Sequence, residues 1–188
     1  MKTIAFITRI HPRRPGMLKV CIDSIKTQTN DDYIHILHRD DKTEDGYGLF
    51  LANQSLVKIS PINARYVMVL DDDDKLIDPK FVELFRKIVG NNNPEIVFFK
   101  GKVIAGRTYP RKEYWGKEPH QGKIASFCFA VRLDIWKKYI RLWGKERRGD
   151  YFFISACYEN TKNHFWFDHS VARTQKRAGC SKGEHEHA

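Results

Sequence analysis

Apolar runs and apolar stripes alternate along the first half of the chain. Short β-prone runs bounded by turn-forming residues are typical of buried strands, and apolar residues that recur with helical spacing are typical of amphipathic helices. The predicted strands cover residues 3–8, 33–38 and 65–70. The predicted helices cover residues 17–29, 49–59 and 78–90. Strands that alternate with helices indicate parallel βαβ units, so the predicted fold class is α/β with an open, mostly parallel sheet flanked by helices.

The alternation changes after an Asn-Asn-Asn-Pro segment at residues 91–94. The second half is predicted to contain strands at 95–103 and 124–131, a loop at 105–122 and a helix at 133–143. Residues 150–158 fit a helix or a strand equally well. Because no linker or internal repeat interrupts the pattern, we expect residues 1–188 to form a single domain with two halves, 1–94 and 95–188.

Composition places the chain among ordinary globular proteins. Apolar residues make up 41% of its 188 residues, which is enough for one sizeable core. No apolar stretch approaches the length of a membrane span, and the four cysteines form no Cys-x-x-Cys pair. We therefore expect a cytoplasmic protein with no transmembrane segment.

The net charge of +10 belongs almost entirely to the second half of the chain. Residues 1–94 carry 14 basic and 13 acidic side chains, whereas residues 95–188 carry 19 and 10. An excess of this kind suggests an anionic partner such as a phosphorylated acceptor, a lipid headgroup or nucleic acid. A solvated basic surface without a partner explains it equally well.

Four consecutive aspartates, Asp71 to Asp74, follow the third predicted strand. Ligands of open α/β sheets bind outside the carboxyl ends of the strands. Adjacent carboxylates repel one another unless a cation is present, and Mg²⁺ or Mn²⁺ prefers oxygen ligands of this type. In an extended segment Asp71 and Asp73 project to the same side. The alternative is an Asp-rich turn that caps a helix, although one aspartate would suffice for that.

Three segments resemble the family 2 glycosyltransferases with the GT-A fold. Residues 66–79, Tyr-Val-Met-Val-Leu-Asp-Asp-Asp-Asp-Lys-Leu-Ile-Asp-Pro, are similar to the family's Leu-Asp-x-Asp-Asp-x-x-x-x-Pro signature, which contains its DxD motif. Residues 40–46 resemble its Asp-Asp-Gly-Ser-Thr-Asp-Gly loop, with Lys42 in place of a glycine, and residues 24–29 resemble its Ser-Ile-x-x-Gln-Thr helix end. Three blocks in the same order are more specific than any one of them.

The resemblance implies a nucleotide-sugar site. Nucleotide-binding positions fall at the end of the first strand and in the two aspartate segments, on Thr8, Arg9, Asp41 and Asp72. The positions that would hold a divalent metal, Mn²⁺ or Mg²⁺, are Asp73 as the principal ligand, Asp71, and a late histidine, for which His169 is favoured over His164.

The resemblance also implies a catalytic base at Asp150. The family carries a Glu-Asp pair at the start of a helix, and here the aspartate is kept while Gly149 replaces the glutamate. A single base that activates the acceptor for direct attack would give an inverting displacement. The alternative is that Asp150 only caps the following helix.

The sequence therefore predicts a metal-dependent glycosyltransferase, with a nucleotide-sugar donor, a UDP-sugar being favoured, and a glycan, lipid-linked or other anionic acceptor. A sugar-nucleotide nucleotidyltransferase is an alternative, but it would want a glycine-rich loop, and residues 8–16 contain only one glycine. The other alternative is a basic nucleic-acid-binding module without enzymatic activity.

Overall fold

The computed structural model describes residues 1–39, 49–103, 106–145 and 148–175. Its helices are α1 (Pro15–Lys26), α2 (Leu49–Leu56), α3 (Phe81–Asn92), α4 (Leu133–Trp143) and α5 (Gly149–Glu159). Its strands are β1 (Lys2–Arg9), β2 (Tyr33–His38), β3 (Ala64–Val69), β4 (Asp74–Leu76), β5 (Ile96–Lys102), β6 (Thr108–Tyr109), β7 (Phe129–Arg132) and β8 (His164–Thr174). Among these helices, none has the length and apolarity that crossing a bilayer requires.

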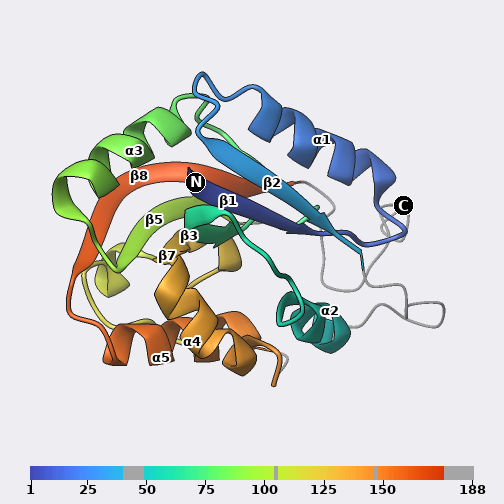
Figure 1. The fold of residues 1–188 in the computed structure, drawn as a ribbon. Helices are drawn as coiled ribbons and strands as arrows, with labels where there is room; N and C mark the ends of the chain where they lie inside the picture. Colours follow the sequence, from blue (N-terminus) through green and yellow to red (C-terminus); the bar gives the residue numbers. More distant parts are fainter. Residues whose placement is uncertain (40–48, 104–105, 146–147, 176–188) are drawn as a thin grey trace.

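The strands form one curled sheet in the order β2-β1-β3-β7-β5-β8-β4, and β6 pairs with β5 (Figure 1). The long ladders are parallel: β1 pairs with β2 and β3, and β5 pairs with β8. The short β7 is antiparallel to both β3 and β5 and lies between them. Because β7 joins the two parallel groups, strands from both halves of the sequence share a single sheet.

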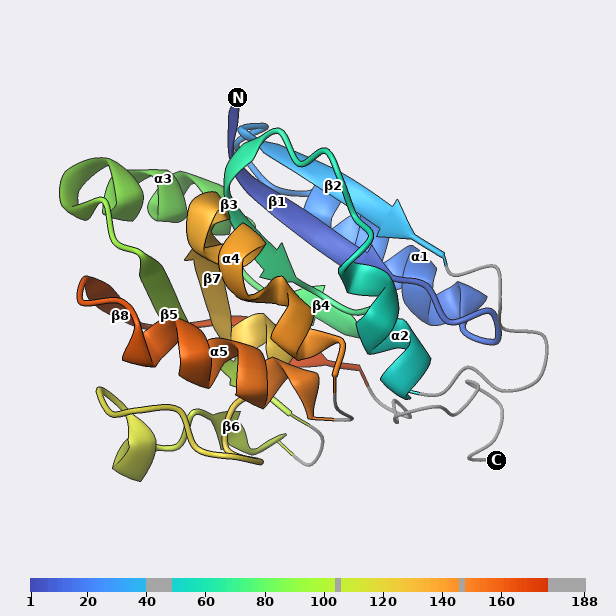
Figure 2. The ribbon, with the colours of Figure 1, turned by 60° about the horizontal axis from the view of Figure 1, so that its bottom comes forward.

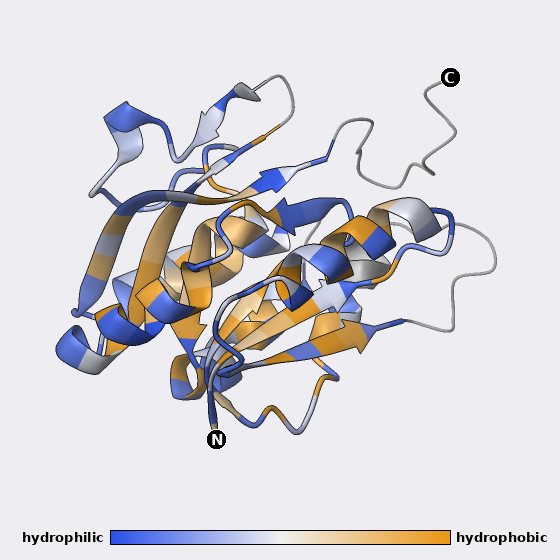
Figure 3. Cartoon of the chain, turned by 90° about the horizontal axis from the view of Figure 1, so that it is seen from above, coloured by the Kyte–Doolittle hydropathy of each residue, from blue (hydrophilic) through white to orange (hydrophobic). Residues whose placement is uncertain are grey.

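Helices cover both faces of the sheet. Helices α1 and α3 lie on one face, and α2, α4 and α5 lie on the other (Figures 1 and 2). The strands in the middle are mainly hydrophobic, whereas hydrophilic segments lie towards the outside (Figure 3). Because β1 and β3 are buried on both faces, their sequences are nearly continuous apolar runs.

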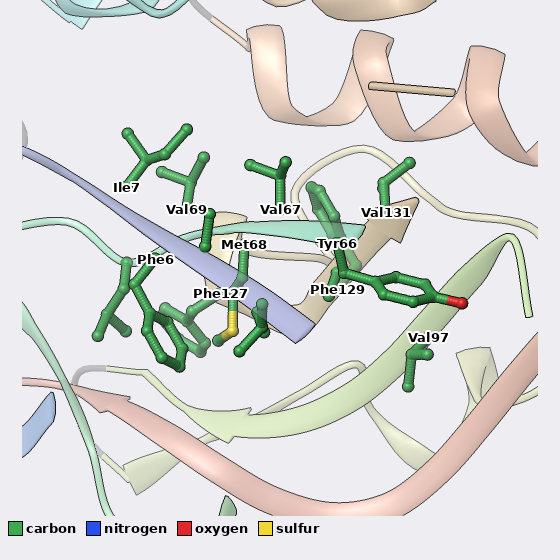
Figure 4. Close-up of a cluster of buried hydrophobic side chains, with 14 of the residues drawn as sticks. Phe6, Ile7, Tyr66, Val67, Met68, Val69, Val97, Phe127, Phe129 and Val131 are labelled. Atoms are coloured by element: carbon green, nitrogen blue, oxygen red, sulfur yellow. The ribbon is translucent and has the colours of Figure 1, made fainter. Parts of the chain in front are cut away.

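Aromatic rings fill the core on both faces. On the α3 face, Phe81 meets Phe99 edge to face, with ring centroids 5.2 Å apart, and Phe85 meets Tyr66 in the same way at 5.2 Å. The Tyr66 hydroxyl donates a hydrogen bond to the carbonyl of Pro94 at 2.6 Å. Figure 4 shows buried side chains from β1, β3, β5 and β7 gathered in one continuous cluster.

The predicted α/β architecture is confirmed. The strands expected at 3–8, 33–38 and 65–70 are β1, β2 and β3, and the ambiguous segment at 150–158 is helix α5. Strands β4, β6 and β8 were not predicted. The longest of them, β8, pairs with β4 only over its last residues. Within the described ranges of the chain, no strand pairs with the other side of the first half of β8. This half also lacks the continuous apolar pattern of a central strand, which is why it was missed.

Helix α5 begins in very close contact with the end of α4. A Cβ atom placed on Gly149 would lie 2.0 Å from the carbonyl oxygen of Trp143 and 2.6 Å from Cδ1 of its ring. Both Gly149 and Trp143 are buried. Only glycine fits at this position, because the obstructing oxygen belongs to the backbone and cannot rotate away.

We predict that Gly149→Ala destabilises the fold by about 2 to 3 kcal/mol, the usual cost of overpacking a tight contact. Gly90→Ala is the matched control, because Gly90 lies within α3 and a Cβ there meets nothing within 4 Å. That variant should gain roughly 0.5 to 1 kcal/mol from helix propensity. Chemical denaturation of both variants checks the difference, and a Gly149→Ala protein as stable as the wild type would contradict it.

Candidate active site

The four aspartates form a turn between β3 and β4. The backbone N–H of Asp74 donates to the carbonyl of Asp71 at 2.9 Å, so the segment is folded back on itself and is not extended as the sequence analysis assumed. In this turn, carboxylate oxygens of Asp71, Asp73 and Asp74 all lie within 4.8 Å of one another. Such a set of hard oxygen donors fits a divalent cation such as Mg²⁺ or Mn²⁺. Asp74, which the sequence analysis did not place among the metal ligands, begins β4 and belongs to this set.

Arg9, the last residue of β1, forms a bidentate ion pair with Asp71. Its Nε lies 2.6 Å from Oδ1 of Asp71, and its Nη2 lies 2.5 Å from Oδ2. The remaining nitrogen, Nη1, donates to Oδ1 of Asn53 in α2 at 2.5 Å. With only 7% of Arg9 exposed, this guanidinium ties together β1, the aspartate turn and α2.

Arg14, the residue immediately before α1, pairs with the next two aspartates. Its Nη1 lies 3.0 Å from Oδ2 of Asp73 and 3.3 Å from Oδ1 of Asp72. Asp72 is itself buried and also accepts a bond from the backbone N–H of His11 at 2.5 Å. Asp72 therefore faces the loop between β1 and α1 and holds that loop against the aspartate turn.

Burial makes these carboxylates hard to ionise. Burial, together with the charge of Asp73, raises the pKa of Asp72 to about 7 against the opposing effect of Arg14. The pKa of Asp73 is also raised by burial, although Arg14 opposes the shift, and the pKa of Asp74 is raised further by burial and by Asp73. These shifts show a site in which negative charge is crowded.

Gln175, which directly follows β8, stabilises the turn through hydrogen bonds to its backbone carbonyls. Its backbone N–H donates to the carbonyl of Asp73 at 2.7 Å. Its side-chain amide donates to the carbonyls of Asp72 at 3.1 Å, Asp74 at 3.3 Å and Met17 at 3.0 Å. The sequence analysis missed this residue because it did not recognise β8; the aromatic and β-branched residues of that segment are the signal that could have identified it.

Thr8 lies beside the turn, but it is fully buried. Its hydroxyl group donates to the carbonyl of Leu70 at 2.8 Å and lies 2.8 Å from Nε2 of His35. Thr8 thus connects the ends of β1 and β3 to a histidine of β2. Its contact with a nucleotide stays a prediction, and His35 is a neighbour that the sequence analysis did not identify.

Asp150 lies in the first turn of α5, following Gly149 at the helix start. One of its oxygens accepts from the backbone N–H of Tyr151 at 2.9 Å, so it is a first-turn carboxylate and the residue at the capping position is Arg148. Burial raises the pKa of Asp150, and the charges of Arg9 and Asp71 influence it in opposite directions. Asp150 is therefore close enough to the aspartate turn for the charges of Arg9 and Asp71 to influence its ionisation.

The predicted histidines lie elsewhere. Nε2 of His169 is 2.6 Å from Oδ2 of Asp78, beyond the aspartate turn along the chain. Nε2 of His164 lies 2.7 Å from the hydroxyl of Thr161, and its ring stacks on Tyr158 with centroids 4.2 Å apart. The remaining candidate, Asp41, is outside the described residues.

The chain matches no model of a known protein family and no curated protein sequence. Its structure is similar to those of glycosyltransferases. It superposes on S. aureus TarS residues 1–349 in complex with UDP-GlcNAc with a TM-score of 0.71 and 14% identity, covering 99% of this chain and 61% of that one. The same fragment without the sugar nucleotide gives a TM-score of 0.67 and 12% identity over 94% of this chain.

A third similar structure is a glycosyltransferase involved in the glycosylation of the major capsid of PBCV-1. It gives a TM-score of 0.60 and 9% identity, and the match covers 94% of both chains. At such identities the similarity establishes the fold, which is the GT-A type that the sequence resemblance implied. This chain spans about three fifths of the TarS fragment.

We predict that His35 makes the stability of the protein depend on pH. Burial, helped by Lys26, lowers the pKa of His35 to about 4, whereas the unfolded chain takes up this proton near about pH 6.5. Because the unfolded state then binds more protons than the folded state, stability is present above about pH 6.5 and is lost as pH falls towards about 4.

Urea unfolding measured between about pH 4.5 and about pH 7.5 checks this, with an expected contribution of up to about 3 kcal/mol. His35→Gln should lose this destabilisation on acidification and keep the opposite contribution of Asp72, whose pKa is raised to about 7. His120→Gln, at an exposed histidine, should keep the wild-type slope. Equal slopes for His35→Gln and the wild type would contradict the assignment.

Proposed function

We propose that this chain is a glycosyltransferase that transfers a sugar from a nucleotide-diphosphate donor, a UDP-sugar being favoured, to an acceptor hydroxyl with inversion at the anomeric carbon. The observation that carries the proposal is the aspartate turn at the end of β3, where oxygens of Asp71, Asp73 and Asp74 converge. The fold is the one in which TarS binds UDP-GlcNAc.

In this proposal, Asp71, Asp73 and Asp74 would hold one Mn²⁺ or Mg²⁺ ion. Their oxygens are close enough together, and they are of the type that such ions prefer. When bound, the ion would neutralise negative charge on the nucleoside diphosphate leaving group. His169 is left out of the proposed ligand set because, among the described residues, the converging ligand atoms belong to the three aspartates and do not include its ring.

The residues around the turn would bind and orient the donor. Arg9 keeps Asp71 fixed through a bidentate pair, and Asp72 holds the β1–α1 loop in place through His11. Thr8 links the ends of β1 and β3 below them. We therefore assign donor binding to residues 1–94, with Asp41 as a further nucleotide contact.

Asp150 is the proposed general base. Its raised pKa makes the carboxylate a stronger proton acceptor than an exposed aspartate, and the start of a helix favours its ionised form. It would take the proton from the acceptor hydroxyl as that oxygen attacks the sugar. No second carboxylate can come from position 149, because the backbone of Trp143 excludes any side chain there.

The acceptor is assigned to residues 95–188, which carry the positive charge of the chain. The excess of 19 basic over 10 acidic residues in this half favours an anionic acceptor, such as a lipid-linked or phosphorylated glycan. The aromatic residues of this half lie in two different environments. Trp143 is fully buried in the core, whereas Trp115 is half-buried and packs against Trp166 and under the Lys100 ammonium group.

We predict that Asp73→Asn lowers the affinity for UDP in the presence of Mn²⁺ by at least about tenfold, because a neutral amide is a poor ligand for a hard cation. Calorimetry with UDP and UDP-GlcNAc, with and without Mn²⁺, measures the change. Asp23→Asn is the control, since Asp23 is exposed and pairs only with Lys19 among its described ion pairs. Wild-type protein that binds neither compound with metal present would sink the proposal.

The same titrations separate the alternatives. A sugar-nucleotide nucleotidyltransferase would bind a nucleoside triphosphate and a sugar phosphate and release pyrophosphate. A nucleic-acid-binding module would bind oligonucleotides with an affinity that falls steeply with salt and does not require Asp73.

We predict that Asp150→Asn lowers the rate of UDP release from UDP-GlcNAc by about 10² to 10⁴, the usual contribution of a general base. Its affinity for UDP should remain that of the wild type. Because the base must be deprotonated to act, the wild-type rate should fall as pH drops through the raised pKa of Asp150, and the variant should lose this dependence. Glu159→Gln, at the exposed far end of α5, is the control. Unchanged turnover in Asp150→Asn would remove the residue from the mechanism.

A further inference from the structure

Arg14 lies where it competes with a metal ion for Asp73. The residue precedes α1, and only 5% of its surface is exposed. Its Nη1 lies 3.0 Å from Oδ2 of Asp73, and Asp73 is one of the three aspartates whose oxygens converge. The carboxylate that would bind a divalent ion is therefore already paired with a cation.

The two arginines of the site are held in different ways. Arg9 contacts Asp71 and Asn53 through three of its nitrogens, in the bidentate geometry that fixes a guanidinium most firmly. In the described part of the chain, Arg14 meets the aspartates through one nitrogen, Nη1, shared between Asp72 and Asp73 at 3.3 and 3.0 Å. The contacts of Arg14 with the aspartates are therefore longer than those of Arg9, and a metal ion at Asp73 would displace them more readily.

A guanidinium and a divalent cation on the same carboxylate repel each other strongly, and burial weakens the screening of that repulsion. Arg14 also stands directly before the first turn of α1, whose first residue is Pro15. A phosphate at this helix start would be favoured by the helix dipole and could accept a bidentate contact from the arginine.

We propose that Arg14 is an exchangeable counter-cation of the aspartate turn. In the free protein it neutralises Asp73 and keeps metal affinity low. With the donor bound, it pairs with the diphosphate and leaves Asp73 to the metal, so that ion binding becomes dependent on the nucleotide. The claim that Arg14 pairs with the diphosphate rests on the proposed function, whereas the claim that Arg14 competes with a metal ion for Asp73 does not.

The test is the affinity of the protein for Mn²⁺ alone, measured by titration without nucleotide, with the wild type and all variants compared at the same pH. Arg14→Gln should bind Mn²⁺ at least about tenfold more tightly than the wild type, because it removes the competing charge. Arg14→Lys keeps the charge and should bind as weakly as the wild type. Arg13→Gln, at the exposed neighbouring arginine, should also behave as the wild type.

A second arm uses UDP at saturating Mn²⁺. Here Arg14→Gln should bind UDP at least about fivefold more weakly than the wild type, because it loses a charged contact with the diphosphate. The wild type should bind Mn²⁺ more tightly once UDP is present, and this coupling should be smaller in Arg14→Gln than in the wild type.

If removing Arg14 prevents folding by leaving Asp72 unpaired, the double variant Arg14→Gln/Asp72→Asn is compared with Asp72→Asn alone. It should again bind Mn²⁺ at least about tenfold more tightly. If folded Arg14→Gln, or the double variant where Arg14→Gln does not fold, binds Mn²⁺ no more tightly than its reference, the inference is overturned. A wild type that fails to bind UDP sinks the proposed function instead, and the comparison with metal alone still decides the role of Arg14.

Discussion

The charge balance of the aspartate turn is the constraint on which the site depends. Four carboxylates are packed into four consecutive residues, and two guanidinium groups from the β1–α1 segment lie against them. Burial raises the pKa values of Asp72, Asp73 and Asp74, and repulsion from neighbouring aspartates, which two positive charges do not fully offset, adds to the shift. One divalent cation would supply the missing charge. The geometry and the electrostatics therefore indicate the same kind of ligand.

The fold determines where this charge can accumulate. Parallel pairing of β1 with β3 brings Arg9 and the aspartate turn to the same end of the sheet, and antiparallel β7 connects them to the strands of the second half. Strand β8 then returns to pair with β4, so that Gln175 bonds to three consecutive residues of the turn. The site is consequently built from both halves of the chain, although its acidic residues come from one segment of the first half.

The sequence predicted the fold well where burial imposes a pattern. Strands β1 and β3 are buried on both faces, so their apolar runs are unambiguous, whereas β8 has an open edge, mixes polar and aromatic residues and was missed. For the site, Asp71 and Asp73 were predicted from a run of aspartates after a buried strand, and Asp150 from the family resemblance, and their roles stay predictions. The turn at Asp71 to Asp74 was taken as extended, because a run of identical residues has no periodicity to reveal a bend. The partners Arg9 and Arg14 lie about 60 residues away in sequence from the aspartates they contact, and such long-range pairs follow only from the tertiary fold.

The single carboxylate at the start of α5 follows from helix packing. The family that the sequence resembles carries a glutamate before its aspartate, and this chain has Gly149. The reason lies in the contact between α4 and α5, because the carbonyl of Trp143 occupies the space of a Cβ. Burial is also the main cause of the raised pKa of Asp150, the next residue along the helix. The packing at Gly149 thus excludes a second acid, while burial at the next position raises the proton affinity of the one acid that remains.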